Sequence, residues 1–368
     1  MIHWRAGTVI DVGRSSPGAQ ECSVQPDGET DTRWSALALT DLVGAPRPGD
    51  RVLLNVSALR KGLGTGGQAL IVARPDALPS DPPADAPGHI MKARYTPLQT
   101  MVCALEEQES PFHEALRTDP KVVAGDLDGT PVIVAELHSA LPAILAGIRA
   151  ERPDTRVAYV MTDSGALPMA YSRTVAGLVE GGWLDLTVSA EQSFGGQYEA
   201  ITVHSALLAA CWVLDAEIIV VAQGPGNAGS STAWGYSGLS SGEALNAVHT
   251  LRGRAIAALR VSGADPRARH RGLSHHADTA LGRVVLGSAD VVIADLPGDF
   301  GALVRDQAQA LVAEATGNLR LIEVPSAGLR EALAASPVPL GTMGRGVEID
   351  DAPFVTAAAA GRYAAGLL

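Results

Sequence analysis

From about residue 122 onward, short apolar segments alternate with longer, alanine-rich segments. The apolar segments have the length of strands and are rich in Val, Ile and Leu. They predict strands at residues 131–136, 157–161, 184–189, 218–222, 255–261, 291–294 and 319–324. The alanine-rich segments predict helices at residues 139–150, 171–180, 198–214, 242–251, 279–286, 300–315 and 353–368. This alternation is typical of a doubly wound, mainly parallel α/β domain, with helices on both faces of the sheet.

The first 75 residues follow a different pattern, without helical periodicity. Short apolar runs at 7–12, 33–39, 50–56 and 68–73, separated by Gly, Pro and Asp, predict a small β-barrel or sandwich-like domain. The glycine-rich run 62–67 stands between two strands. It therefore lacks the strand-to-helix context of a nucleotide-binding loop and is predicted as a plain turn. A linker rich in Pro and Asp, residues 76–90, leads into the α/β domain, residues 91–368.

The segment that follows the linker carries two basic residues, Lys92 and Arg94, beside Tyr95. This pair either contacts an anionic ligand or forms a solvated end of the linker. A helix-like run follows at about residues 99–107.

Polar residues and glycines follow five of the predicted strands. If these strands are parallel, the loops after them meet at one edge of the sheet, where ligands usually bind. The segment 265–276 follows the strand predicted at 255–261 and is the densest of the five loops in titratable groups. It holds three histidines, His270, His275 and His276, and three arginines, Arg267, Arg269 and Arg271.

Arginines beside these histidines disfavour bound cations and favour a bound anion, to which a guanidinium group offers two parallel hydrogen bonds. We therefore expect His270, His275 or His276 to act as an acid/base, beside an anion held by Arg269 and Arg271. Two alternatives remain open: a divalent metal held by these histidines and Asp163, and a structural or solvated cluster.

A long loop after the strand at 218–222 is the strongest candidate for contacts to an anion. Glycines allow close approach of the backbone to a ligand, and hydroxyl groups add hydrogen-bond donors. The predicted binding residues are Gly224, Gly226, Asn227, Gly229, Ser230, Ser231 and Thr232. The loop matches neither the Walker motif nor the dinucleotide fingerprint, and a plain surface loop is the alternative.

Two further residues stand at predicted strand ends. Asp163 follows the strand at 157–161, where an aspartate can ligate a metal, orient a histidine, act as a base or cap the next helix. His138 follows the strand at 131–136 and is a further catalytic candidate. The neighbouring Ser139 does not make a Ser–His nucleophile with it, because no GxSxG elbow is present.

Composition narrows the class of protein. Hydrophobic residues make up 46% of the chain and aromatic residues only 4%, so Ala, Val, Leu and Ile must build the core. A formal net charge of −12 argues against a nucleic-acid partner. Three widely spaced cysteines, Cys22, Cys103 and Cys211, form no disulfide framework, which indicates a reducing compartment. With no apolar run near ~20 residues and no signal peptide, we expect a cytoplasmic protein without a membrane partner.

Several motifs, in one order along the chain, resemble a bacterial family known only as domain of unknown function 3866. They lie at residues 55–59, 62–67, 88–99, 161–168, 223–226, 270–276 and 342–345. The resemblance covers nearly the whole chain and implies no known activity.

The sequence thus indicates an enzyme, either a hydrolase or a transferase, that acts on a small anionic metabolite, phosphorylated or carboxylated. The absence of a dinucleotide fingerprint and of paired cysteines disfavours redox chemistry. The alternative is a non-enzymatic sensor that binds a nucleotide or metabolite. Substrate, metal and oligomeric state stay open at this point, a divalent metal and a homo-oligomer among them.

Overall fold

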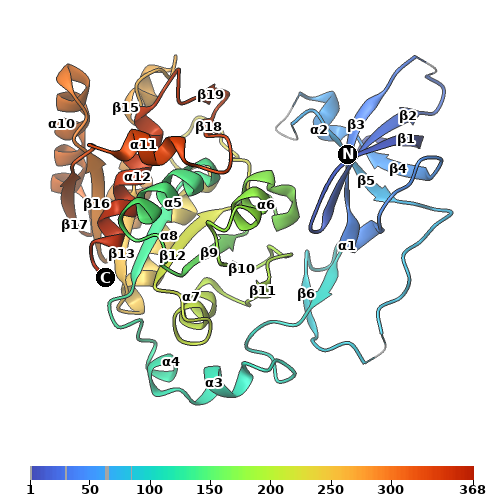
Figure 1. The fold of residues 1–368 in the computed structure, drawn as a ribbon, viewed down its shortest axis with the longest axis horizontal. Helices are drawn as coiled ribbons and strands as arrows, with labels where there is room; N and C mark the ends of the chain where they lie inside the picture. The colour runs from blue at the N-terminus through green and yellow to red at the C-terminus, as the bar shows by residue number, and fades with distance from the viewer. Residues whose placement is uncertain (1, 30, 63–65, 84) are drawn as a thin grey trace.

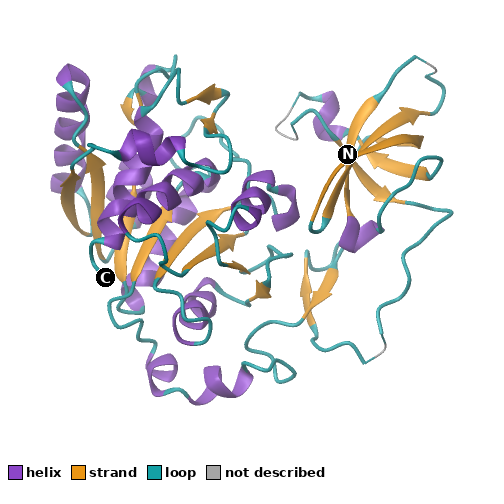
Figure 2. Ribbon diagram, in the orientation of Figure 1, coloured by secondary structure: helices purple, strands orange, loops and turns teal. Residues whose placement is uncertain are grey.

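A computed structural model of the chain describes residues 2–29, 31–62, 66–83 and 85–368. Figures 1 and 2 show a small group of strands near the N-terminus beside a larger body in which helices cover a sheet. The predicted fold class, a barrel-like part followed by a parallel α/β part, is confirmed. The turn predicted at 62–67 falls largely on residues 63–65, which lie outside the described residues. In the ranges that the structure describes, none of the helices combines the length and apolar character needed to cross a bilayer.

The N-terminal strands close into a five-stranded barrel in the order β1-β2-β3-β5-β4. The strands are β1 (Trp4–Ser16), β2 (Ala19–Pro26), β3 (Trp34–Leu39), β4 (Arg51–Asn55) and β5 (Ala69–Ala73). Alternate side chains such as Val9, Val24 and Leu54 fill its interior, which buries apolar surface as the period of two requires. Two short helices, α1 (Thr40–Val43) and α2 (Ser57–Arg60), lie in the connections.

The sequence analysis missed β2 and misplaced one helix. β2 buries Ala19, Cys22 and Val24 between polar residues, so it has no continuous apolar run to mark it. The helix predicted at 99–107 is wrong, because β7 (Thr100–Val102) pairs there with β6 (Ile90–Lys92). The first helices after this hairpin are α3 (His113–Thr118) and α4 (Pro120–Ala124).

The larger body contains an eight-stranded sheet in the order β11-β10-β9-β12-β8-β13-β16-β17, and every adjacent pair is parallel. Its strands are β8 (Pro131–Ala135), β9 (Val157–Thr162), β10 (Leu186–Ser189), β11 (Tyr198–Glu199), β12 (Ile218–Gln223), β13 (Arg254–Ala258), β16 (Ser288–Ala294) and β17 (Asn318–Val324). The central strands β8, β9 and β12 are buried along their whole length. This burial explains their unbroken apolar runs.

Helices cover both faces of this sheet. One layer contains α5 (Leu141–Glu151), α6 (Arg173–Glu180), α11 (Leu329–Ala334) and α12 (Ala352–Ala365), and the other contains α7 (Val203–Trp212), α8 (Ser240–Thr250) and α10 (Gly298–Glu314). α5 and α12 cross so closely that a Cβ atom at Gly147 would collide with the carbonyl of Ala358. The alanine-rich composition therefore serves tight packing of helix on helix.

The sheet reverses its winding direction between two neighbouring strands, β8 and β12. From β8 the chain moves to β9 on one side, whereas from β12 it moves to β13 on the other side. In open α/β sheets, ligands bind at the carboxyl edge beside such a reversal.

The strand and the helix that flank the histidine-rich segment differ from prediction. The strand predicted at 255–261 ends at Ala258, and a separate strand β14 (Val261–Ser262) pairs antiparallel with β15 (Gly272–Leu273). The helix predicted at 279–286 begins earlier, as α9 (His276–Thr279), and continues as a π-helix over Ala280–Val284. The β14–β15 hairpin turns the chain back on itself, and this turn brings the histidines to the carboxyl edge at the end of β8.

Candidate functional site

The buried carboxylate of Glu136 is the centre of the site. Glu136 comes directly after β8, at the carboxyl edge of the sheet, and its side chain is only 9% exposed. Its Oε1 atom accepts hydrogen bonds from Arg260 Nη1 at 3.0 Å, from His276 Nδ1 at 2.8 Å and from Asn227 Nδ2 at 3.3 Å. Three loops, after β8, β12 and β13, are thereby joined by one oxygen atom.

Burial of Glu136 disfavours its charged form, but its partners more than compensate. The hydrogen bond from His276 and the charge of Arg260 hold the pKa of Glu136 below its ordinary value. The group is therefore an anion at neutral pH. The sequence analysis missed this residue because it was taken as the last position of an apolar strand. A carboxylate ending such a strand at the carboxyl edge is the signal that could have identified it.

Three imidazole rings, which we call the histidine trio (His270, His275 and His276), lie together beside Glu136. Their ring centroids are 4.5 to 5.2 Å apart. The backbone sets this arrangement, because the Ser274 N–H donates to the Arg260 carbonyl and the His275 N–H donates to the Arg269 carbonyl. The predicted convergence of the three histidines therefore follows from the hairpin.

Each histidine of the trio has a different set of partners. His276 stacks on the Tyr236 ring at 3.8 Å, and the Tyr236 hydroxyl donates to the His276 carbonyl. His270 Nδ1 lies 2.8 Å from Ser274 Oγ. His275 Nε2 is buried and has no hydrogen-bond partner. A buried ring nitrogen without a hydrogen-bond partner is costly in a folded protein, so this atom is a candidate contact for a bound group.

The surroundings keep two of these rings neutral. Burial, together with the charges of Arg260 and Arg267, lowers the pKa of His270 to about 4. Burial, the neighbouring His276 and the charge of Arg269 also lower the pKa of His275. Neutral imidazoles carry a lone pair that can accept a proton or bind a metal.

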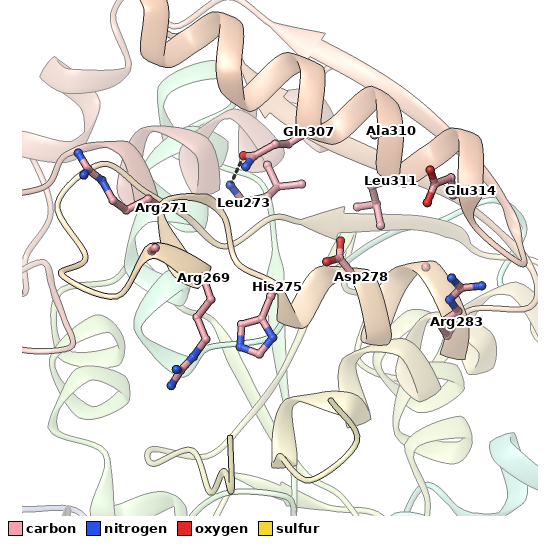
Figure 3. Close-up of a pocket in the computed structure, with 12 residues that line it drawn as sticks. Arg269, Arg271, Leu273, His275, Asp278, Arg283, Gln307, Ala310, Leu311 and Glu314 are labelled. Atoms are coloured by element: carbon pink, nitrogen blue, oxygen red, sulfur yellow. Dashed lines mark hydrogen bonds between the residues drawn. The ribbon is translucent and has the colours of Figure 1, made fainter. Parts of the chain in front are cut away.

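A cavity of about 380 Å³ opens beside the trio. Figure 3 shows Arg269 and His275 side by side at one end, with Arg283 and Glu314 at the other end beyond Asp278. Burial and the charge of Glu314 raise the pKa of Asp278, which His275 opposes. Arg283 shares its end of the cavity with the acidic Asp278 and Glu314, whereas Arg269 stands beside His275, so the end near His275 is the more positive part.

Arg271 lines the same cavity but extends away from Arg269 (Figure 3). The two arginines predicted to clamp one anion thus do not point at a common position. Arg267, a third arginine of the segment, is paired with Asp265 at 2.9 Å.

The base of the glycine-rich loop belongs to the site. Asn227 connects it to Glu136, and Gly226 has a φ of +92°, a conformation that favours glycine. Gly224 lies so close to the backbone of Ala166 that a Cβ atom would collide with its carbonyl. These glycines allow close packing of loop on loop at the carboxyl edge.

The outer part of the loop bonds mainly to itself. The hydroxyls of Ser230 and Thr232 are 2.9 Å apart, and a bridge joins Gly229 to Tyr236. Ser231 is exposed and has a φ of +65°. Anion binding by Gly229, Ser230, Ser231 and Thr232 remains a prediction.

Asp163 lies at the same edge of the sheet but contacts other residues than the histidine trio does. Its Oδ2 accepts a hydrogen bond from the Gln192 N–H at 3.2 Å, and it faces Glu191, whose pKa is raised by burial and by Asp163. Within the described ranges, no hydrogen bond or ion pair joins Asp163 to the histidine trio. The carboxylate that contacts the trio is Glu136 instead.

His138 is buried away from the trio. Its Nδ1 lies 3.0 Å from the Tyr159 hydroxyl and its Nε2 lies 2.7 Å from Ser172 Oγ. Burial lowers the pKa of His138 to about 4. With both ring nitrogens engaged, this histidine is placed to support the core beneath the loops.

We expect His138 to make the protein less stable in acid. Its pKa of about 4 in the folded state lies below the ordinary value of 6.5, so the unfolded chain binds the proton more tightly. Its contribution is fully present above pH 6.5 and is lost as the pH falls toward 4, about 3 kcal/mol in all. Urea unfolding at several pH values should show the free-energy difference between wild type and His138→Gln shrinking across this window. A difference that stays constant would contradict the argument, and His204→Ala on the exposed face of α7 is the control.

Comparison with known proteins agrees with the resemblance seen in the motifs. A family model described as "Protein of unknown function (DUF3866)" matches residues 35–361. The match begins in the barrel at β3 and includes Glu136 and the histidine trio. No curated protein matches the chain.

Proposed function

Because the chain belongs to the DUF3866 family, whose description gives no function, we propose a function from the site itself. The protein is an enzyme that hydrolyses a small anionic substrate or transfers a group from it, and the histidine trio is its reactive centre. One observation carries this proposal: His275, whose Nε2 atom is buried and unpartnered, lines a cavity beside Arg269.

The charges around the trio support an anionic substrate. Arg260 is paired with Glu136 and Arg267 with Asp265, so their charges are already balanced. Among the described residues, the Arg269 side chain has no ion-pair or hydrogen-bond partner, and it is exposed. A free guanidinium group can bind a phosphate or carboxylate through two parallel bonds.

The size and place of the cavity support a small ligand. A volume of about 380 Å³ lies within the range of small-molecule sites, roughly 300–1,000 Å³. His275, which lines the cavity, lies beside His276, and His276 contacts Glu136 at the carboxyl end of β8. Ligands of open α/β sheets bind at this edge.

The test is a screen of phosphomonoesters, phosphodiesters and carboxylic esters for turnover. Arg269→Ala should lower kcat/KM by about 10- to 100-fold, the worth of one charge-assisted hydrogen bond or two. His275→Ala should lower it by at least about 100-fold. Arg47→Ala, an exposed arginine of the barrel, is the matched control and should leave turnover unchanged. Turnover that survives His275→Ala would refute the assignment of the trio as the reactive centre.

A second cavity favours the alternative, a sensor that binds a nucleotide or metabolite without turnover. This cavity, about 800 Å³, lies between the barrel at Arg14 and Pro17 and the α/β part at Met169, Val179 and Gln197. A ligand held there would be displaced by Ala176→Trp and unaffected by His275→Ala. Thermal-shift measurements with both variants separate the two functions. If the protein is the proposed enzyme, His275→Ala should weaken ligand binding and Ala176→Trp should leave it unchanged.

A further inference from the structure

We propose that the histidine trio binds one divalent first-row transition-metal ion, of which Zn²⁺ is the model case. The inference deepens the proposed function and rests on it for its biological meaning, since it makes these side chains metal ligands in place of proton carriers. Imidazole nitrogens are the ligands that such ions commonly take in proteins.

The geometry of the trio fits an ion of this kind. One ring nitrogen from each histidine lies within 4.8 Å of one from each of the others. In a tetrahedral zinc site, with Zn–N bonds of about 2.0–2.1 Å, the nitrogens lie about 3.4 Å apart. Small rotations of the rings bring the three nitrogens to this separation. Three protein ligands leave a fourth position for water or a substrate oxygen, as in catalytic zinc sites.

The hydrogen bonds around the trio select the ligand atoms. Glu136 accepts from Nδ1 of His276, and Ser274 Oγ contacts Nδ1 of His270. Metal-bound histidines generally use their second nitrogen in this way, because a carboxylate or hydroxyl partner orients the ring. We therefore assign Nε2 as the ligand atom in His270 and His276. The unpartnered Nε2 of His275 completes the set.

The nearby positive charges do not exclude a cation, although they argue against one in the sequence alone. Arg260 faces His276 at 3.4 Å, but it is also 3.0 Å from the carboxylate of Glu136. Arg267 is neutralised by Asp265. Arg269 remains as a free charge, and it is placed to hold the anionic part of a substrate whose oxygen binds the ion.

A second group of potential ligands, His89, Glu107 and Glu109, serves as the internal comparison. His89 is 70% exposed, and the Glu107 carboxylate already accepts from two backbone N–H groups, those of His89 and Ala104. Both oxygens of that carboxylate are therefore already engaged by backbone hydrogen bonds. A divalent ion should therefore prefer the histidine trio.

The experiment uses the full-length chain, stripped of metal by a chelator and titrated with Co²⁺. Binding should appear as visible d–d absorption with one ion per chain. His275→Ala and His276→Ala should weaken binding by at least about 100-fold. Glu136→Gln, which changes a positioning residue, should weaken it about 10- to 100-fold. Zn²⁺ should raise the melting temperature of the wild type but not of His275→Ala.

His89→Ala and His204→Ala are the matched controls and should bind Co²⁺ like the wild type. Circular dichroism of each metal-free variant shows whether it has folded, and the partly exposed His275 is the safest position for substitution. Binding that survives His275→Ala, or that is lost in His89→Ala, would overturn the inference. Turnover by a chain that binds no Co²⁺ would also overturn it while leaving the proposed function intact. Co²⁺ binding without turnover of any substrate would support the metal site and count against the function.

Discussion

Glu136→Gln is expected to lower the free energy of unfolding by about 3 kcal/mol at neutral pH. The substitution keeps the size of the side chain but removes the negative charge that faces Arg260. The Arg260 side chain is only 11% exposed, so water cannot replace the lost partner. Removing one member of a buried ion pair costs far more than the pair contributes, because the other charge stays buried. Urea unfolding of the metal-free protein measures the change.

A double variant separates this cause from a general disturbance of the loops. Glu136→Leu combined with Arg260→Met removes both charges, and it should recover most of the stability lost in Glu136→Gln. Glu114→Gln breaks the exposed pair with Arg117 and should cost less than about 1 kcal/mol. If the double variant is as unstable as the single one, the buried charge of Arg260 is not the reason.

The parallel sheet could be predicted because its central strands are buried on both faces. Val157–Thr162 and Ile218–Gln223 are unbroken apolar runs for that reason, and the predicted strands match them within one residue. β2 could not be predicted in the same way, because one of its faces is polar. The run at 255–261 was misleading because it holds two strands in different sheets. The charged Arg260, next to Leu259, is the local signal of the break between them.

The topology predicted the edge of the sheet at which the candidate site lies, but not which residues meet there. The rule that parallel strands end at one edge correctly indicates that the segment 265–276 lies there. It cannot say which loops touch, because that depends on strand order. β9, which Asp163 directly follows, is separated from β8 by β12, whereas β8 and β13 are neighbours. Glu136 therefore meets His276, and Asp163 meets Gln192 instead.

Lys92 shows how a basic residue that looked solvated can be structural. The sequence placed it at a linker end, in contact with an anionic ligand or with water. The structure buries Lys92 completely, so the solvated alternative is wrong for this residue, whereas Arg94 of the same pair is exposed. Its Nζ donates to the carbonyls of Glu191 and Ala200 at 2.6 and 2.9 Å, and it lies 3.6 Å from Glu199. The β6–β7 hairpin is thereby attached to the loops that follow β10 and β11.

Lys92→Met should lower the free energy of unfolding by about 3 kcal/mol at pH 8, since two buried carbonyls lose their donor. Glu199 makes this cost depend on pH. Burial raises the pKa of Glu199 to about 7, above its ordinary 4.5, although Lys92 opposes the rise. A raised pKa contributes stability that is present below pH 4.5 and is lost as the pH rises through 7. Without Lys92 that loss grows, so the variant should be less destabilised at pH 5 than at pH 8.

Adding Glu199→Gln to Lys92→Met should remove this pH dependence, because the double variant has no carboxyl group left to ionise there. It should also recover part of the stability at pH 8, while the cost of the two unpaired carbonyls remains at every pH. Lys61→Met, on an exposed lysine of the barrel, is the matched control and should change stability by less than about 0.5 kcal/mol. An equal loss for Lys92→Met at pH 5 and pH 8 would mean that Glu199 does not feel the charge of Lys92. The anchoring role would then rest on the backbone hydrogen bonds alone.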